Sequence, residues 1–422
     1  MSTIGPIIVV LLCAMAAALA AMAVAPFGIL NATSIALAAT ATVAMSQCFM
    51  LATRPRFLEP LFGGLDRMYR VHKWLGISAL ALMIGHQLIE PHFKRWTRET
   101  TLGEAAGELG EFTLYGFIGL ILLSWFKRLP FLGLELPYQW WRLSHRLTGL
   151  LFVLVAIHQL FTDKPMAAGS PLSAYLNAFC VMGIAAYAYT ELAAWRLRRR
   201  TFVVREILRR GSTTQIVLSP QRRKLQWTPG QFAFVSVPEA GLAEPHPFTI
   251  ANAPSAGGDM TLAIKALGDW TSRLPGALRT GMEAVVDGPY GRFDFRKGRN
   301  HQLWLAGGIG ITPFLAWAHS LTEIEARHIH LVYCVSTPDE AIGVDVLEKA
   351  AARNARFTFE VVVSSRDGRL TARRLTEKLP FSIKDADMYY CGPDGLRQAM
   401  ERGLAAMGQS PRSVNFELFE LR

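Results

Sequence analysis

The chain begins with long apolar blocks and continues with short runs in which apolar and polar residues alternate. Six of the blocks are long enough to cross a bilayer, because a membrane helix needs about 20 mostly apolar residues. We expect these spans at residues 6–25, 33–53, 71–90, 111–128, 143–162 and 172–195. From residue 201 onward the alternating runs, glycines and prolines are typical of a globular protein. The pattern therefore predicts an all-α membrane bundle of six helices over residues 1–200, followed by globular domains.

The globular part divides into two predicted domains. Three short runs are strand-like and predict a small antiparallel β-barrel over residues 201–297. They lie at 201–208, 214–219 and 232–237. A strand, a glycine turn and a helix follow at 303–321, and two further buried strand patterns come later in the chain. This alternation predicts an α/β, Rossmann-like nucleotide-binding domain over residues 298–422.

Basic residues are unevenly distributed among the segments that connect the predicted spans. They gather at 54–73, 127–146 and 196–200, whereas the alternate segments carry only Lys94, Arg95, Arg98 and Lys164. By the positive-inside rule, this asymmetry predicts that the amino terminus and the globular half are cytoplasmic. The same basic segments account for the net charge of +11, so no nucleic-acid partner is predicted.

The first span has an alternative interpretation as a cleaved signal peptide, because residues 23–25 resemble a cleavage site. No Lys or Arg precedes the apolar run, and the run is longer than such signals usually have, so we favour a membrane span. The five cysteines show no paired spacing, which predicts neither a disulfide framework nor a thiolate metal site.

Four of the ten histidines lie in two predicted spans, His72 and His86 in the third and His145 and His158 in the fifth. An ionisable side chain at membrane depth costs a few kcal/mol, so such residues usually serve chemistry or transport. The two spans run in the same direction, which puts His72 level with His145, and His86 level with His158. At 1.5 Å per residue the two levels are about 20 Å apart. Facing imidazoles at two levels suit the axial ligation of two haem irons, so these histidines are the predicted metal ligands.

Other interpretations of these histidines remain open. They are also compatible with hydrogen bonding inside a bundle, or with a proton relay in a transporter whose globular half senses a nucleotide. The second pair is thirteen residues apart, which leaves an ideal helix about 140° out of phase. We therefore expect a bend or bulge in the fifth span, or haems that approach it from different sides. In the haem interpretation Gly76 and Gly149 would leave room for a porphyrin edge, and Phe152 would lie between the macrocycles.

Short motifs in the globular half carry candidate binding chemistry. In chain order they are HPFT at 246–249, KALGDWT at 265–271, DGPYG at 287–291, GGIGITPF at 307–314, CGP at 391–393 and ELF at 417–419. Gly307, Gly308 and Gly310 would let backbone amides approach a pyrophosphate at the start of a helix. Any tight strand-to-helix turn can use such glycines, so this turn alone is a weak signal.

The ordered motifs resemble the flavin reductase module of the ferredoxin-NADP reductase superfamily. Together with the histidine pairs, the whole chain resembles the ferric reductase and NADPH oxidase superfamily, most closely its oxidase branch with its compact bacterial members. The resemblance implies an FAD-binding barrel, an NAD(P)H-binding domain and two haems b in the membrane. It also implies a multi-pass protein of the bacterial inner membrane with cytoplasmic reductase domains.

The resemblance further implies roles for single residues. The FAD would contact His246, Pro247, Phe248, Thr249, Gly268, Trp270 and Thr271. The nicotinamide nucleotide would contact Gly307, Gly308, Gly310, Thr312, Pro313, Gly392 and Pro393. Two residues would act at the reacting rings, with Cys391 near the nicotinamide and Phe419 covering the isoalloxazine until hydride transfer. Taken singly, the aromatic residues are equally compatible with an ordinary core, and Cys391 with a small buried apolar residue.

Nicotinamide delivers two electrons as a hydride, whereas a haem iron accepts one at a time, so a flavin is the converter that such a chain requires. We therefore expect an enzyme, a superoxide-generating NAD(P)H oxidase that passes electrons through FAD and two haems b to external oxygen. The alternatives are a ferric-chelate reductase and a haem subunit that serves a quinone or a partner protein. Donor and acceptor are small molecules, lipid surrounds the spans, and no obligatory protein partner is predicted.

Two details of substrate choice stay open. The predicted outer loop at 91–110 has basic residues that would attract either superoxide or an anionic chelate, namely His92, Lys94, Arg95 and Arg98. The second span opens with Asn31 and lacks an arginine that would mark an oxygen site. Residues 336–340, after the strand that ends at Val335, lack the arginine that many NADPH users have there, and Arg366 is an alternative candidate for binding a 2'-phosphate. The resemblance favours NADPH over NADH.

Overall fold

The computed structural model describes residues 4–125, 138–167, 169–239 and 241–417. The chain divides into two compact units, Met1–Leu197 and Arg198–Arg422, and each is described by itself. The end of the fourth predicted span and Phe419 lie outside the described residues.

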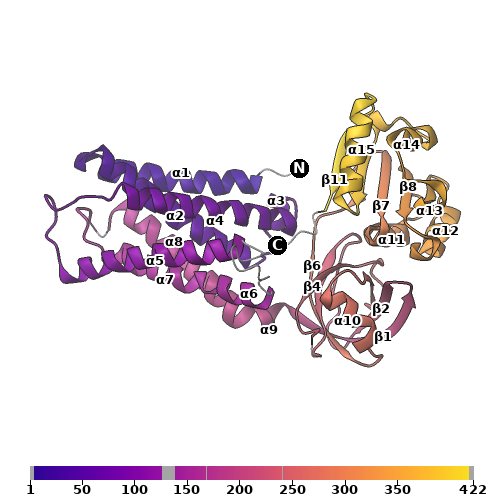
Figure 1. The fold of residues 1–422 in the computed structure, drawn as a ribbon, viewed down its shortest axis with the longest axis horizontal. Helices are drawn as coiled ribbons and strands as arrows, with labels where there is room; N and C mark the ends of the chain where they lie inside the picture. The colour runs from indigo at the N-terminus through magenta and orange to yellow at the C-terminus, as the bar shows by residue number, and fades with distance from the viewer. Residues whose placement is uncertain (1–3, 126–137, 168, 240, 418–422) are drawn as a thin grey trace. The chain divides into compact units, whose positions relative to one another are not determined.

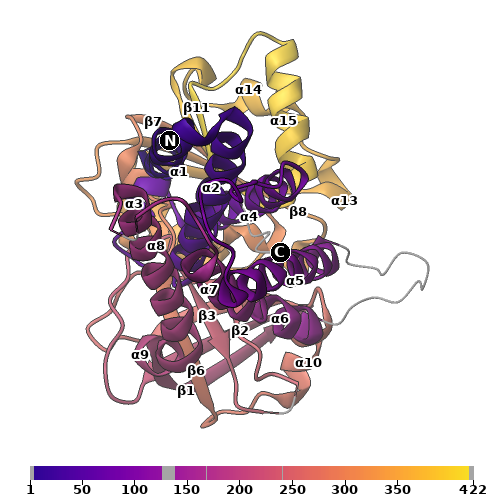
Figure 2. The same ribbon diagram turned by 90° about the vertical axis from the view of Figure 1, so that its left-hand side faces the viewer.

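The first unit is a bundle of helices. Its elements are α1 (Ile4–Val24), η1 (Ala25–Phe27), α2 (Ile29–Ala52), α3 (Glu59–Phe62), α4 (Leu65–Leu88), α5 (Thr101–Trp125), α6 (Tyr138–Arg146), α7 (Thr148–Phe161), α8 (Pro171–Ala188), η2 (Tyr189–Ala193) and α9 (Ala194–Arg198). Within the unit α2 packs against α1, α4 and α8, and α5 packs against α7 (Figures 1 and 2). The bundle therefore has α2 as a neighbour of α4, and α5 as a neighbour of α6 and α7, the three helices that carry the predicted histidine ligands.

Five stretches of the described residues are long and apolar enough to cross a membrane. They are Ile4–Phe27, Ile29–Ala52, Thr101–Ser124, Trp140–Phe161 and Pro171–Arg198. The third predicted span is the helix α4, but this helix begins six residues before residue 71 and takes in charged residues at 66, 67, 70 and 73. This helix is not among the five stretches that are apolar enough to span, so a membrane domain of six spans stays a prediction.

The fifth predicted span is interrupted, which is one of the two outcomes that the histidine spacing led us to expect. Helix α6 ends at Arg146, Leu147 forms a turn, and α7 begins at Thr148. The last span also departs from regular α-helix, because η2 is a π-helix between α8 and α9. The fourth span begins at Thr101 and not at 111, so the loop that precedes it is about ten residues shorter than predicted. Thr100 explains the earlier start, because its Oγ1 accepts from the Gly103 N–H at 3.0 Å and caps the helix.

The second unit begins with the predicted antiparallel sheet. Its strands are β1 (Arg199–Arg210), β2 (Thr213–Pro220), β3 (Phe232–Ser236), β4 (His246–Thr249), β5 (Met260–Lys265) and β6 (Glu283–Tyr290), in the order β4-β3-β6-β1-β2-β5. A single bridge from Ile250 to Leu262 links the chain after β4 with β5, and so joins the two edges of the sheet. Alternate strand residues such as Phe202, Val204, Ile216 and Leu218 bury one face. Helix α10 (Asp269–Ala277) packs on this core through Trp270 and Leu274.

The rest of the second unit is a parallel sheet covered by helices on both faces. The strands are β7 (His301–Gly307), β8 (His328–Val335), β9 (Phe357–Val363), β10 (Asp387–Cys391) and β11 (Ser413–Phe416), in the order β11-β10-β7-β8-β9. One face forms a core with α11 (Thr312–Ser320) and α12 (Val344–Arg353), and the other with α14 (Ala372–Lys378) and α15 (Asp394–Ala406). Figure 1 shows these helices flanking the sheet. The α/β domain predicted from the sequence is confirmed.

The two parts of the second unit share contacts. Phe293 and Phe295, which follow the barrel, belong to the core around Trp304 and Trp317. The indole N–H of Trp317 donates to the carbonyl of Pro229 at 3.0 Å. The domain boundary at residues 297 and 298 stays a prediction, because this aromatic packing spans it.

Candidate functional site

The four membrane histidines form two pairs. The rings of His72 on α4 and His145 on α6 have centroids 6.1 Å apart and planes at 70°. Two imidazoles on opposite faces of one metal ion have centroids about 6 Å apart, given metal–nitrogen bonds of about 2 Å. His86 on α4 and His158 on α7 are near enough for their ring charges to interact. The structure therefore brings together the same partners that the helix direction predicted.

Three of these histidines bind a backbone carbonyl through Nδ1. His72 Nδ1 lies 3.1 Å from Cys48 O, His86 Nδ1 lies 3.1 Å from Ser34 O, and His158 Nδ1 lies 2.7 Å from Ala106 O. A carbonyl oxygen only accepts, so Nδ1 of each ring carries the proton. The Nε2 atom of each neutral ring then keeps its lone pair, which is the form that binds a metal ion.

The fourth histidine reaches the same state through a hydroxyl. His145 Nδ1 lies 3.3 Å from Ser124 Oγ, and Ser124 uses its single proton on Leu120 O at 2.8 Å. The hydroxyl oxygen is therefore the acceptor for His145 Nδ1–H. Iron-ligating and zinc-ligating histidines in proteins typically make such a bond through the second ring nitrogen, which fixes tautomer and orientation.

Each ligand-bearing segment has its own orienting helix. Residues 34 and 48 on α2 are fourteen apart, as are His72 and His86 on α4. Ala106 and Ser124 on α5 are eighteen apart, which is five turns at 3.6 residues per turn, so they lie on one face of that helix. His145 and His158 both bond to this face although their spacing of thirteen does not fit one helix. The interruption at Leu147 therefore absorbs the phase difference.

Glycines around the histidines differ in what they make room for. A Cβ on Gly110 of α5 would lie 2.4 Å from His158 Nδ1, so this glycine is needed for the histidine to approach α5. A Cβ on Gly76 would meet nothing within 4 Å, which leaves that glycine available to a porphyrin edge as expected. A Cβ on Gly149 would lie 2.2 Å from Tyr187 Cδ2, so this glycine makes room for that ring, and its contact with a porphyrin edge stays a prediction. Phe152 is fully buried between the two levels and packs on Phe49 at 5.1 Å.

No group of three or more metal-binding side chains is found in the described parts of the chain. Two facing imidazoles are the complete protein ligand set of a bis-histidine haem, because the porphyrin supplies the other four nitrogens. The donor set and its geometry thus fit a haem and not a protein-only metal site.

The HPFT and GDWT motifs meet in the barrel as an aromatic cluster. The ring of Trp270 on α10 lies 4.9 Å from that of His246 and 5.4 Å from that of Phe248, both on β4. Among the described residues, His246 Nε2 and Trp270 Nε1 are buried ring nitrogens without a hydrogen-bond partner. Burial lowers the pKa of His246, so the ring is neutral at neutral pH. Orphaned nitrogens beside an aromatic surface fit a flavin nucleotide, whose polar groups would supply the partners.

The other residues of these motifs are placed differently. Thr249 is buried at the end of β4, and Pro247 pairs with Phe234 across the sheet. The amide of Gly268 donates to Thr271 Oγ1 at 3.0 Å and so already has a partner within the protein. This bond starts α10, which gives Thr271 a capping role besides the predicted contact with FAD.

The glycine turn and the CGP motif lie together where the strand order of the parallel sheet reverses. The chain runs outward from β7 through β8 to β9, and β10 lies on the other side of β7. A Cβ on Gly310 would lie 2.3 Å from Cys391 O, and one on Gly307 would lie 2.8 Å from Pro393 Cδ. Gly392 has a φ of +155°. Ligands of open α/β sheets bind in the crevice at such a switch point, so these glycines occupy the expected nucleotide position.

The flanking residues hold this arrangement. Thr312 and Pro313 are the first two residues of α11 and are buried, which fits a helix start where proline costs no hydrogen bond. Tyr390 donates its hydroxyl proton to Pro393 O at 2.5 Å and braces the CGP turn. Burial raises the pKa of Cys391 well above its usual range, so its thiol is neutral. Cys391 is therefore a neutral side chain that packs in the core. Its position near the nicotinamide stays a prediction.

The basic residues of the loop before α5 are partly neutralised. Lys94 Nζ pairs with Glu99 at 3.0 Å. His92 exchanges two backbone hydrogen bonds with the side chain of Asn31, at 2.8 and 3.1 Å. Asn31 thus fastens the loop to α2. In the next loop, half-buried Lys164 donates to Gln159, a residue beside His158.

Sequence reasoning missed the residues that orient the histidines. Ser34 and Ser124 carried a detectable signal, since they are hydroxyl residues inside apolar spans. The carbonyls of Cys48 and Ala106 carried none, because any residue supplies a carbonyl. Lys164 appeared only in a count of basic residues.

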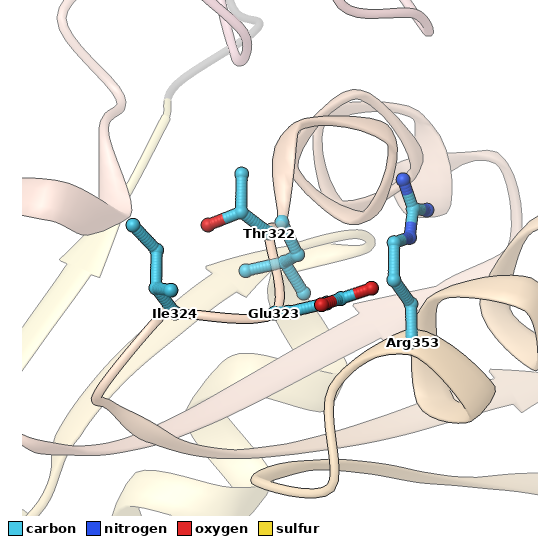
Figure 3. A pocket seen from close by; sticks show the side chains of 5 residues that line it. Thr322, Glu323, Ile324 and Arg353 are labelled. Carbon is cyan, nitrogen blue, oxygen red and sulfur yellow. The ribbon is translucent and has the colours of Figure 1, made fainter.

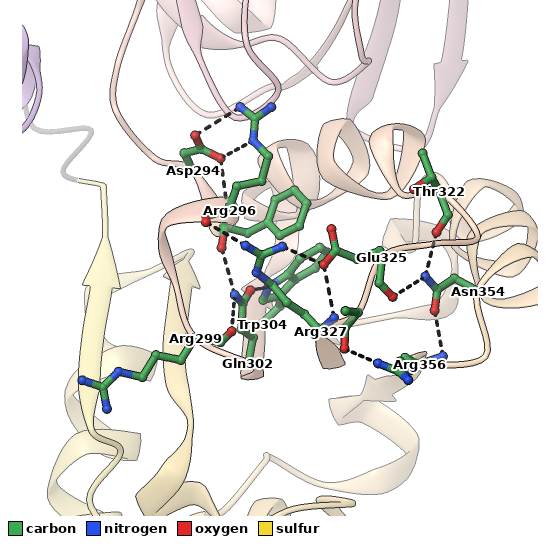
Figure 4. Close-up of polar contacts among 12 residues, drawn as sticks. Asp294, Arg296, Arg299, Gln302, Trp304, Thr322, Glu325, Arg327, Asn354 and Arg356 are labelled. Atoms are coloured by element: carbon green, nitrogen blue, oxygen red, sulfur yellow. Dashed lines mark hydrogen bonds and ion pairs between the residues drawn. The ribbon is translucent and has the colours of Figure 1, made fainter.

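An open hollow lies at the opposite edge of the parallel sheet, between α11 and β8. Its lining residues are Leu321, Thr322, Glu323, Ile324 and Arg353 (Figure 3). Asn354 holds the loop that contains Thr322 and Glu325. Its side-chain amide donates to Thr322 O at 2.7 Å and to Glu325 O at 3.2 Å (Figure 4). This edge holds the amino ends of the strands, so it is not where the fold binds nucleotides.

Three protein-family models match the chain. They are a ferric reductase like transmembrane component over residues 37–156, an FAD-binding domain over 202–294 and an oxidoreductase NAD-binding domain over 304–402. These matches follow the order of the described fold, in which a helical unit precedes an antiparallel sheet and a parallel sheet. The combination of the three domains in this order matches the ferric reductase and NADPH oxidase-like superfamily.

Curated relatives match about half of the chain. The toluate 1,2-dioxygenase electron transfer component of Pseudomonas putida is 27% identical over 210 residues, which are 48% of this chain and 62% of that protein. The flavohemoprotein of Bordetella pertussis is 28% identical over 258 residues, 56% of this chain and 63% of that protein. The chain therefore spans less than two thirds of these relatives.

A solved structure, the flavohemoglobin from Malassezia yamatoensis with bound FAD and heme, aligns with 95% of this chain and 98% of its own. Its sequence identity is 17% and its TM-score is 0.50, so the likeness concerns the fold alone.

Proposed function

We propose that this protein moves electrons from cytoplasmic NAD(P)H through FAD and two bis-histidine haems b to an acceptor outside the cell, with oxygen reduced to superoxide. The observation that carries the proposal is the state of four membrane histidines, each with Nδ1 bonded inside the protein and Nε2 left for a metal ion. FAD supplies the exchange between two-electron and one-electron chemistry, and the haems supply a one-electron path through lipid.

The membrane residues would hold and orient the haems. His72 and His145 would ligate the inner one, and His86 and His158 the outer one. Cys48 O, Ser34, Ala106 O and Ser124 would fix the ring orientations. Phe152, buried between the levels, would exclude water from the gap. The basic segments at 54–73 and 196–200 favour a cytoplasmic reductase half in a bacterial inner membrane.

The reductase residues would hold the two nucleotides. His246, Phe248 and Trp270 offer a flavin an aromatic surface with two unused ring nitrogens. Gly307, Gly310 and Gly392 allow a backbone approach at the switch point. Phe419 as a cover for the flavin remains a prediction from the resemblance.

The ferric-chelate reductase is the second candidate, because the matched membrane family is named for ferric reductases. An anionic chelate would meet the same basic groups as superoxide, namely those of the loop before α5 and of Lys164. Oxygen needs no such binding groups, and the pairing of Lys94 with Glu99 leaves less positive charge than the sequence suggested. This ion pair supports the oxidase over the reductase.

NADPH is the proposed donor. Arg366 follows β9, and its exposed guanidinium pairs with Asp367 at 2.8 Å. The amide of Ser365 donates to Ser336 O at 3.1 Å, which joins the loops after β9 and β8 at the carboxyl edge of the sheet. Replacing Arg366 with Ala should raise KM for NADPH about tenfold, as for a lost charged hydrogen bond, and leave KM for NADH unchanged. An equal change for both nucleotides would assign the 2'-phosphate elsewhere.

The decisive experiment is a reduced-minus-oxidised optical spectrum of the purified full chain. Two haems b per flavin are expected, and a protein without haem b bands would favour the proton relay. The acceptor is then decided by NADPH consumption under air. Cytochrome c reduction that superoxide dismutase blocks supports the oxidase, whereas consumption that requires ferric citrate supports the reductase. A haem-containing chain that consumes no NADPH by itself would be a subunit for a quinone or partner protein.

A further inference from the structure

Ser34 of α2 makes contacts that distinguish one histidine level from the other. We propose that Ser34 is a positioning residue that lowers the reduction potential of the haem held by His86 and His158. The inference rests on the proposed function, because it requires two haems at these histidines.

Both histidines of the outer level have two oxygen acceptors near Nδ1. His86 Nδ1 lies 2.8 Å from Ser34 Oγ and 3.1 Å from Ser34 O. The Ser34 hydroxyl proton goes to His86 O at 3.2 Å, so its oxygen is free to accept. His158 Nδ1 lies 2.7 Å from Ala106 O and 3.4 Å from Thr162 Oγ1, which donates its own proton to His158 O.

The inner level has half as many of these contacts. His72 Nδ1 has Cys48 O at 3.1 Å, and His145 Nδ1 has Ser124 Oγ at the longer distance of 3.3 Å. The latter is a neutral hydroxyl that also serves Leu120 O. The acceptor strength around the imidazoles is therefore greater at the outer level.

This difference acts on iron through the ligand. An acceptor on Nδ1–H increases the basicity of the imidazole, and a more basic ligand stabilises ferric over ferrous iron. Ser34 is completely buried, so water does not replace or weaken its contact. The Ser34 hydroxyl would therefore make the outer haem harder to reduce than the same site would be without it.

The test is the reduction potential of each haem in the full-length protein. The spectrum of Ser34→Ala, which keeps the carbonyl of residue 34 and loses the hydroxyl, is followed against applied potential. Ser46→Ala is the matched control, because Ser46 is a completely buried serine of the same helix that donates to Phe179 O and contacts no histidine. His158→Leu, which retains the inner haem, identifies which component belongs to which level.

We expect Ser34→Ala to shift the outer component to a more positive potential, with the inner component and the haem content unchanged. Thr162→Val should shift the same component in the same direction, and Ser124→Ala the inner one. Ser46→Ala should shift neither. An unshifted outer component in a Ser34→Ala protein that keeps its outer haem overturns the inference. A chain without haem fails earlier, at the proposed function. Should Ser34→Ala lose its outer haem, the shift in Thr162→Val decides.

Discussion

The histidines of the membrane half and the ring nitrogens of the reductase half are prepared for a cofactor in opposite ways. In the bundle, all four predicted ligands have their second nitrogen bonded to a protein oxygen, three of them to backbone carbonyls. In the barrel, His246 Nε2 and Trp270 Nε1 are buried without a partner. The protein itself thus orients the groups that would hold a metal, and leaves unsatisfied the groups that would hold a nucleotide.

The difference follows from what each ligand offers. A porphyrin iron bonds to one nitrogen lone pair, and the protein must make sure that the correct tautomer presents it. A flavin nucleotide carries many acceptors and donors, so a buried protein donor can take its partner from the ligand. Changes in the bundle should therefore alter cofactor content, whereas changes at the unpartnered donors should alter affinity.

The strongest way to break this comparison is to remove a ligand. His158→Leu should lose about half of the haem b, because one of two bis-histidine sites is destroyed. Reduction of the external acceptor should fall to background while NADPH still reduces FAD. Haem content is measured by the pyridine haemochrome spectrum, with His92→Leu as a control on an exposed loop. Full haem content in His158→Leu would refute the ligand assignment.

A smaller change tests the orientation alone. Gly110→Ala places a Cβ 2.4 Å from His158 Nδ1, so the ring must leave α5 and lose its bond to Ala106 O. Loss of an orienting partner typically weakens metal affinity about 10- to 100-fold, so the outer haem should be partly lost on purification. Gly107→Ala on the same helix meets nothing within 4 Å and should keep both haems. Equal haem content in the two variants would contradict the orienting role.

The unpartnered donor is tested by two tryptophans of one domain. Trp270→Phe removes an N–H that has no protein acceptor, and should raise the FAD dissociation constant about fivefold, the cost of about 1 kcal/mol for one hydrogen bond. Trp227→Phe removes an N–H that donates to Asn252 O at 2.9 Å. It should lower the free energy of unfolding by about 1–3 kcal/mol and leave FAD affinity intact. Flavin fluorescence and thermal unfolding separate these outcomes, and a reversal between the two variants would dismiss the distinction.

The smallest expected effect concerns pH. Burial lowers the pKa of both His246 and His330, so each ring stays neutral in the folded protein after its counterpart in the unfolded chain has taken up a proton. The unfolded state then binds more protons, and stability should fall as pH decreases from about 7.5 through the ordinary histidine range near 6.5.

Release of FAD on heating reports this pH trend in the full-length protein. His330→Gln lies outside the flavin cluster and should make the decline shallower. Stability that increases between pH 7.5 and 5.5 would rule out the neutral state of these rings.

The sequence predicted the architecture better than the contacts. The alternation of apolar residues in the strands, the glycine turn and the pairing of the histidines were local sequence patterns. Each corresponds to a feature of the fold. The start of the third span was predicted six residues too late, because α4 extends into a charged segment that was not counted as part of the apolar block. The start of α5 was missed because Thr100 caps it from a polar stretch that resembles a loop.

The backbone contacts that orient the histidines could not be predicted from the sequence. Cys48 O and Ala106 O are backbone atoms, so the identity of the residue is irrelevant to their role. Gly149 illustrates the reverse case, since a glycine that fits a porphyrin edge equally fits Tyr187. Whether a glycine faces a cofactor or a side chain depends on how the neighbouring helices pack against it.

Leu147 keeps helical dihedrals, with φ −64° and ψ −20°, so the two histidines of this span are joined by one nearly continuous helical path. One residue more or fewer between them would turn His158 by about 100° around the helix axis and away from Ala106 O. A haem site in this bundle would thus be as sensitive to an insertion in the span as to the loss of a ligand.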